Sequence, residues 1–208
     1  MKIHFKGIYK GKSEQLDYLD KYCETEHKPG AIKLPKQKKF YYLKVHLFYT
    51  LIFVLFSFIL CLRYHLVTNS SDRLFFVLIL GFFTILHTLL LPIHEILHTV
   101  FNKKDSFIYI YPKGLCMFVM NIEEKSKAIK ILEFLFPSII LGLLPFVIGL
   151  IFPQFKFLGI FAIPGIATGA GDYMNIFRFL RYIPNGAKIY THIDDGEFWY
   201  IPEESELN

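Results

Sequence analysis

The chain has 208 residues, of which 53% are hydrophobic and 18% are aromatic, and its formal net charge is +5. This composition is too apolar for an ordinary soluble domain, and the modest positive charge gives no reason to expect a nucleic-acid partner. Cys23, Cys61 and Cys116 are too scattered to predict a disulfide framework or a cysteine zinc site. The composition therefore predicts a multi-pass protein of the cell membrane, with the lipid bilayer as its first partner.

Residues 1–42 are polar and rich in lysine, and they contain no apolar core that would predict a removable signal peptide. A short amphipathic helix could form around Leu16, Leu19 and Cys23. The bases and aromatics of residues 36–42 are typical of a positive-inside signal before a membrane span, with a lipid-headgroup contact as the alternative. We therefore expect residues 1–42 to be a cytoplasmic N-terminal segment.

Four apolar segments follow, and each approaches the roughly 20 residues that a helix needs to cross a bilayer. They cover residues 43–62, 74–91, 131–152 and 157–180. The sequence therefore predicts an all-α membrane protein with about four transmembrane helices. Residues 43–182 would form the membrane domain, and residues 183–208 would form a cytoplasmic C-terminal tail.

The most specific signal in the chain is HEILH, residues 94–98, which follows the second apolar segment. Two histidines four apart share one face of a helix, about 6 Å apart along its axis. Two imidazoles at this spacing can bind one Zn²⁺, and Glu95 can hold and deprotonate a water at the metal. The alternative is a chance pattern among the eight histidines. Charged groups at membrane depth are rare and usually functional, which favours the metal site.

The residues on either side of HEILH predict how the motif is presented. Pro92 lacks a backbone N–H, so a kink or a helix restart is expected just before the motif. After the motif, residues 106–121 contain two strand-like runs around Pro112 and Gly114, which predicts a β-hairpin. The edge of this hairpin could pair with an extended substrate peptide, or the hairpin could serve packing alone.

Charge placement predicts the topology. Lysines and arginines are concentrated in the N-terminal segment, in residues 103–130 and in residues 178–188. With four spans, the positive-inside rule places both termini and the hairpin in the cytoplasm. The second and fourth spans then run in the same direction, so HEILH and Asp172 lie at the same depth.

A catalytic zinc needs a third protein ligand beside His94 and His98, and Asp172 is the best placed carboxylate. Its alternative role is an interfacial or backbone-bonding residue. His87 lies on nearly the same face as His94 but about 10 Å away along the axis, which predicts a supporting or packing role. Asn175 could orient a ligand or a substrate carbonyl, or make a structural hydrogen bond.

In the order of its features the chain resembles the intramembrane site-2 zinc metalloproteases. The features are HEILH in a membrane helix, a hairpin, another span, and an aspartate in a small-residue helix. The chain is more closely similar to a bacterial group of zincin membrane peptidases that was defined as a domain of unknown function. The similarity covers most of the chain from about residue 43, including GDYMN and the C-terminal tail. It implies a zinc endopeptidase with His94, His98 and Asp172 as metal ligands and Glu95 as the base. Site-2 proteases usually have glycine after the aspartate, whereas here Gly171 precedes it.

These residues predict a membrane-embedded zinc metallopeptidase that hydrolyses peptide bonds of membrane-associated proteins or peptides. A different class uses the same ligands, namely a non-catalytic metal-binding scaffold or a divalent-metal carrier. The position of Glu95 favours the enzyme, because a pure binding site does not need a glutamate there. The chain also lacks the internal repeat that many carriers have.

Overall fold

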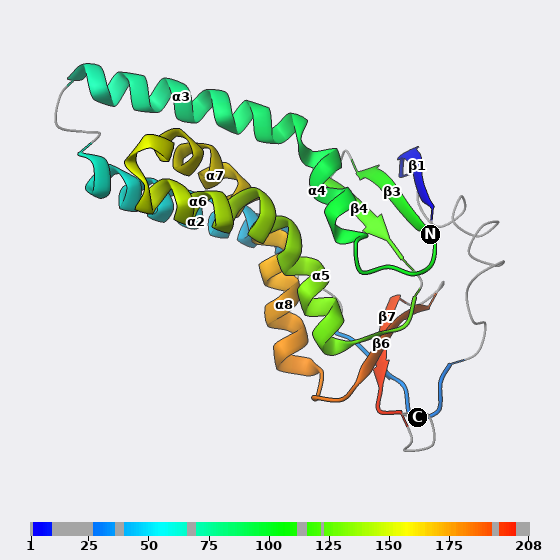
Figure 1. The fold of residues 1–208 in the computed structure, drawn as a ribbon. Coiled ribbons are helices and arrows are strands. Elements are labelled where there is room, and N and C mark those ends of the chain that lie inside the picture. The colour runs from blue at the N-terminus through cyan, green and yellow to red at the C-terminus, as the bar shows by residue number, and fades with distance from the viewer. Residues whose placement is uncertain are drawn as a thin grey trace. The chain divides into compact units, whose positions relative to one another are not determined.

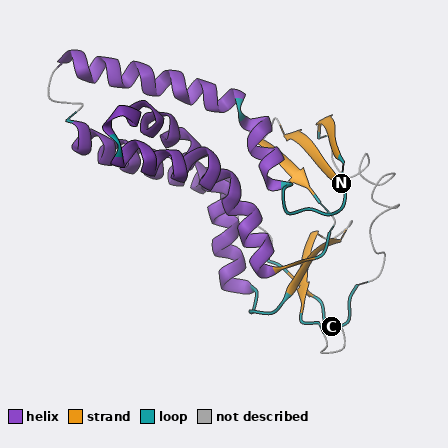
Figure 2. Ribbon diagram, viewed as in Figure 1, coloured by secondary structure: helices purple, strands orange, loops and turns teal. Residues whose placement is uncertain are grey.

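The computed structural model describes residues 2–9, 27–35, 40–65, 70–111, 116–121, 123–192 and 196–202. The described chain is mostly helical and contains two small sheets (Figures 1 and 2). It divides into a sheet unit (residues 1–38, 95–133 and 175–208) and a helical unit (residues 39–94 and 134–174). The expected amphipathic helix near Leu16, the predicted hairpin turn and the end of the tail lie outside the described residues.

The helical unit contains the long apolar helices. Its first two are α2 (Tyr41–Tyr64) and α3 (Ser70–Leu89). The third apolar segment consists of α5 (Lys127–Ser138), whose residues 127–133 belong to the sheet unit, the π-helical turn η2 (Ile139–Leu143) and α6 (Leu144–Ile151). Three described stretches are long and apolar enough to cross a membrane: Tyr41–Tyr64, Ser71–Leu89 and Lys127–Ile151. This agrees with a membrane protein and with the first three predicted spans.

The π-helical turn has a cause in the sequence. Pro145 has no N–H, so it cannot donate to the carbonyl of Leu141 four residues earlier. The N–H of Leu144 instead donates to the oxygen of Ile139, five residues back. Pro145 therefore changes the hydrogen-bonding pattern of this span without ending it.

The fourth apolar segment is not one continuous helix. After the short 3-10 turn η3 (Pro153–Phe155), it forms α7 (Lys156–Thr168) and α8 (Ala170–Tyr182), which are separated at Gly169. A Cβ atom at Gly169 would overlap the Ser138 hydroxyl and the Tyr173 ring, so only glycine fits this junction. Where four transmembrane helices were expected, the described residues thus contain three candidate spans, and the fourth segment is two helices of 13 residues each.

Helix α7 is the centre of the helical unit. It packs against α2, α3 and α6, and most of its side chains are buried, among them Ile160, Ala162 and Ile163. Small residues permit this close packing, because a Cβ at Gly149 of α6 would overlap the backbone of Gly159 on α7. The outward faces of α2 and α3 carry exposed leucines, phenylalanines and valines, as lipid-facing helices do.

The sheet unit contains more β structure than the all-α prediction allows. One sheet has the order β1-β3-β4, built from β1 (Ile3–Ile8), β3 (Ser106–Tyr111) and β4 (Cys116–Met120). Strands β3 and β4 pair antiparallel, with Phe107 opposite Met120. Strand β1 pairs parallel with β3, with Ile3 opposite Ser106. This parallel pairing was not predicted, because it joins segments about a hundred residues apart and leaves no local turn signal.

The second sheet is antiparallel, with the order β2-β7-β6-β5. Its strands are β2 (Ile32–Lys33), β5 (Lys125–Ser126), β6 (Lys188–His192) and β7 (Gly196–Tyr200). Buried Tyr190, Phe198 and Tyr200 form its small apolar cluster. Residues of the C-terminal tail, in β6 and β7, therefore form the main part of a sheet to which the N-terminal segment adds β2.

Candidate metal centre

The HEILH motif lies on α4 (Leu91–His98), a short helix that begins two residues after α3 ends. Pro92 is its second residue, a position where the missing N–H removes no helical hydrogen bond. The N–H groups of Ile93 and His94 both donate to the oxygen of Leu90, at 2.9 and 3.0 Å. The predicted helix restart before the motif is therefore present, and it makes the motif a helix of its own.

Three side chains of α4 form a compact cluster. The nitrogens of His94 and His98 and a carboxylate oxygen of Glu95 all lie within 4.8 Å of one another. All three residues are buried, with exposures of 6–7%. Imidazole nitrogen and carboxylate oxygen are donors that Zn²⁺ accepts, so the cluster fits this ion. Among the described residues, this is the group of histidine, cysteine and acidic side chains that could hold a metal.

A hydrogen bond to the backbone determines which nitrogen of His98 can bind a metal. Its Nδ1 atom lies 2.8 Å from the backbone oxygen of Glu133 on α5. A carbonyl oxygen only accepts, so Nδ1 carries the proton and donates it. The Nε2 atom of the neutral ring then keeps its lone pair and is available as a metal ligand. This tautomer is one in which a histidine can bind zinc, through Nε2.

Asp172 lies beside His94. Its Oδ2 atom is 3.2 Å from Nε2 of His94, and the carboxylate is mostly buried in the first turn of α8. Two ligands at 2.0–2.1 Å from one zinc, at the tetrahedral angle, lie about 3.3 Å apart. At 3.2 Å the two atoms form a hydrogen bond, and the same separation also fits two ligands of a shared ion. The structure thus brings Asp172 to His94, whereas the compact cluster itself is formed by the three residues of α4.

His87 has the surroundings of a packing residue. It is buried in α3, its Nδ1 donates to the oxygen of Phe83 at 3.1 Å, and its ring lies 4.3 Å from the ring of Phe161. A Cβ at Gly165 of α7 would overlap its Nε2 atom, so the glycine makes room for the imidazole. Asn175 lies one helical turn after Asp172 on α8 and is half-buried.

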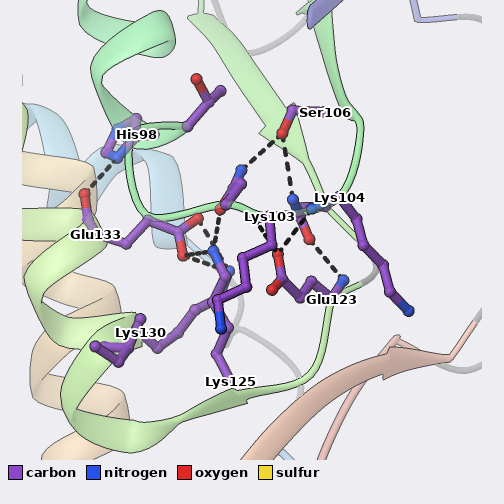
Figure 3. A network of polar contacts seen from close by, with 12 residues as sticks. His98, Lys103, Lys104, Ser106, Glu123, Lys125, Lys130 and Glu133 are labelled. Carbon is purple, nitrogen blue, oxygen red and sulfur yellow. Dashed lines mark hydrogen bonds and ion pairs between the residues drawn. The ribbon is translucent and has the colours of Figure 1, made fainter. Parts of the chain in front are cut away.

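Sequence reasoning missed the residues that surround His98. Lys125 and Glu133 form a buried ion pair with 2.7 Å between Nζ and Oε2, and Lys125 also donates to Asn102 (Figure 3). Burial lowers the pKa of Lys125 from its usual value, and the negative charge of Glu133 opposes this shift. The available signal was Glu133 itself, a carboxylate at the beginning of an apolar span.

His94, Glu95 and His98 could therefore hold a metal ion, and Asp172 lies beside His94. A family model described as "Putative zincin peptidase" matches residues 87–188, which include α4 and Asp172. The matched residues are therefore similar to the zincin peptidases, and the match suggests a zinc metallopeptidase. No match was found among curated proteins or among solved structures.

Proposed function

We propose that this protein is a membrane-embedded zinc metalloendopeptidase in which His94, His98 and Asp172 hold the metal and Glu95 is the catalytic base. The observation that carries the proposal is the combination of the buried α4 cluster with the 3.2 Å approach of Asp172 to His94. Three protein ligands leave a fourth position of a tetrahedral zinc free for water. The site-2-protease-like arrangement is part of this proposal.

Each side chain has a distinct task in peptide hydrolysis. Zinc bound here would lower the pKa of a water ligand towards about 7 and polarise the scissile carbonyl. Glu95 would take the proton from the attacking water and give it to the departing amine. Its burial next to both histidines keeps this carboxylate within reach of the same substrate bond. His98 would keep its proton on Nδ1 and donate it to the Glu133 backbone oxygen throughout the reaction.

The proposed substrates are membrane-associated proteins or peptides. Peptide bonds within a helix are shielded, so the substrate segment would have to be extended before attack. The outer edge of β4 could hold it by strand addition, since β3 is already paired on both sides. In this proposal the helices cross the cell membrane, with α7 and α8 together forming a fourth pass and both termini in the cytoplasm.

Zinc content and peptide hydrolysis of Glu95→Gln test the function. The neutral amide cannot act as a base, so the variant should keep its zinc and lose hydrolysis of a membrane-peptide substrate by at least about a hundredfold. A wild-type protein that binds zinc but cleaves no member of a transmembrane-peptide library would instead indicate the scaffold or carrier. Equal cleavage by Glu95→Gln and wild type would remove Glu95 from the mechanism.

A further inference from the structure

A buried polar network begins at His98 and reaches the first sheet. Lys125 Nζ donates to Glu133 Oε2 at 2.7 Å and also to Asn102 Oδ1. Asn102 Nδ2 donates to the hydroxyl of Ser106, the first residue of β3, at 2.7 Å. Figure 3 shows these contacts continuing from the His98–Glu133 hydrogen bond. The network therefore joins the metal-binding histidine to the strand that follows it in the chain.

Stability alone is a weak reason for this arrangement. Lys125 and Glu133 have exposures of only 5% and 3%, so both charges are almost completely removed from water. Burying two charges costs free energy that their attraction offsets only in part, and apolar pairs of similar volume are often as stable or more stable. A buried ion pair in this position calls for a role that an apolar pair would not fulfil.

Glu133 contacts the network twice. Its backbone oxygen accepts the Nδ1 proton of His98, while its carboxylate accepts from Lys125. Lys125 in turn bonds to Asn102, which lies four residues after His98. The contacts thus form a closed ring from His98 through Glu133, Lys125 and Asn102 back along the chain to His98. A ring of this kind restrains both the His98 imidazole and the carbonyl that selects its tautomer.

We propose that Lys125 and Glu133 are positioning residues for His98, with the ion pair holding the Glu133 carbonyl where it orients the imidazole. Partners that orient a metal-binding histidine raise metal affinity because the ligand atom is fixed before the ion arrives. This inference rests on the proposed zinc site. It adds two residues that act through His98 and do not themselves bind the metal.

The test compares full-length variants purified in detergent. The double variant Lys125→Met/Glu133→Leu replaces the buried ion pair by apolar side chains of similar volume and so removes the linkage. Lys130, whose Nζ also lies 3.3 Å from the Glu133 carboxylate, loses that contact but keeps a partly exposed side chain that water can reach. Lys127→Met is the matched control, because Lys127 is also a buried lysine but donates to Ile183 and Asn185. Lys125→Arg keeps the charge and a donor for Glu133. Zinc affinity is measured by chelator competition, and ligand geometry by the visible spectrum of the Co²⁺ protein.

The double variant should bind zinc about 10- to 100-fold more weakly than wild type, with an altered Co²⁺ spectrum. Lys127→Met should match wild type, and Lys125→Arg should recover much of the affinity. A folded double variant with wild-type affinity and spectrum would overturn the inference. If the double variant does not fold, Glu133→Gln, which keeps the side-chain shape, decides by the same two readouts. A wild-type protein that binds no zinc would contradict the proposed function itself. The failure of the proposed function can therefore be told apart from the failure of the positioning role.

Discussion

Nε2 of His94 and Oδ2 of Asp172 lie 3.2 Å apart, although the two residues are 78 positions apart in the chain. One belongs to the helix that carries HEILH, and the other belongs to the first turn of α8. This is the separation expected for two ligands of one tetrahedral zinc. It is also the main structural support for Asp172 as the third ligand.

Asp172→Asn should therefore weaken zinc binding by at least about tenfold, because a neutral amide is a poorer ligand for the cation than a carboxylate. The fold should be retained, since the side-chain volume is unchanged. Chelator competition measures the affinity, and circular dichroism checks the helices.

His87→Ala is the control for this substitution. His87 packs against Phe161 and bonds to the Phe83 carbonyl, so its loss should leave the zinc affinity near that of wild type. If His87→Ala lost the zinc while Asp172→Asn bound it normally, the third ligand would lie along the α3–α4 segment and our assignment would be wrong.

The sequence was informative about the site because the residues of HEILH lie within five consecutive positions. Two histidines and a glutamate within five residues, followed by a distant aspartate in a small-residue segment, lead to the prediction of His94, Glu95, His98 and Asp172 as site residues. The structure brings the first three together and places Asp172 beside His94. The surroundings of His98 could not be predicted. They depend on a backbone carbonyl of Glu133 and on a buried lysine. Glu133 stands out in the sequence as a carboxylate at the beginning of an apolar span, but its contacts with His98 and Lys125 have no signal in a single sequence.

The fold was predictable in its apolar part and less so elsewhere. The length and hydropathy of the apolar segments are sufficient to predict α2, α3 and the α5–α6 segment. They do not reveal the break at Gly169, which depends on the neighbouring Ser138 and Tyr173. The parallel pairing of β1 with β3 is equally hidden, because strand pairing over about a hundred residues depends on tertiary contacts.

A second prediction concerns helix packing in the membrane domain. Gly149→Ala would place a methyl group against the backbone of Gly159, where neither helix can move aside without disturbing α7. We expect a loss of about 1–3 kcal/mol in the free energy of unfolding. Thermal unfolding in detergent measures it. Gly81→Ala is the control, because a Cβ there meets no atom within 4 Å and alanine favours the helix. Equal stability of both variants would contradict the close approach of α6 and α7.

A third prediction concerns acid stability. Asp105 accepts hydrogen bonds from the Lys2 N–H at 2.7 Å and from His4 at 3.2 Å, and these contacts hold its pKa below the ordinary value of 3.8. A lowered folded-state pKa stabilises the protein above the unfolded value, and this stabilisation is lost as pH falls from about 3.8 through the folded-state pKa. The pairing of β1 with β3 should therefore weaken as the pH falls below about 3.8.

Asp105→Asn removes the titrating group, so the variant should lack this part of the pH dependence. Thermal midpoints measured from pH 6 down to pH 3 should fall more steeply for wild type than for the variant. Parallel curves for the two proteins would show that Asp105 does not anchor β1 through its charge.

A fourth prediction concerns topology. The lysine-rich segments place both termini in the cytoplasm when α7 and α8 complete a fourth pass. In a variant whose Cys23, Cys61 and Cys116 are replaced by serine, single cysteines introduced at Lys10 and Glu204 should react with a membrane-impermeant reagent only after the cells are opened. Labelling of either position in intact cells would contradict the four-pass arrangement.

The zinc content of purified protein, with and without the two histidines of α4, tests the central claim most directly. The wild type should contain about one zinc per chain, and the His94→Ala/His98→Ala variant should contain almost none, because Asp172 alone holds zinc poorly. Full zinc occupancy in the double histidine variant would place the metal elsewhere and contradict the proposed site.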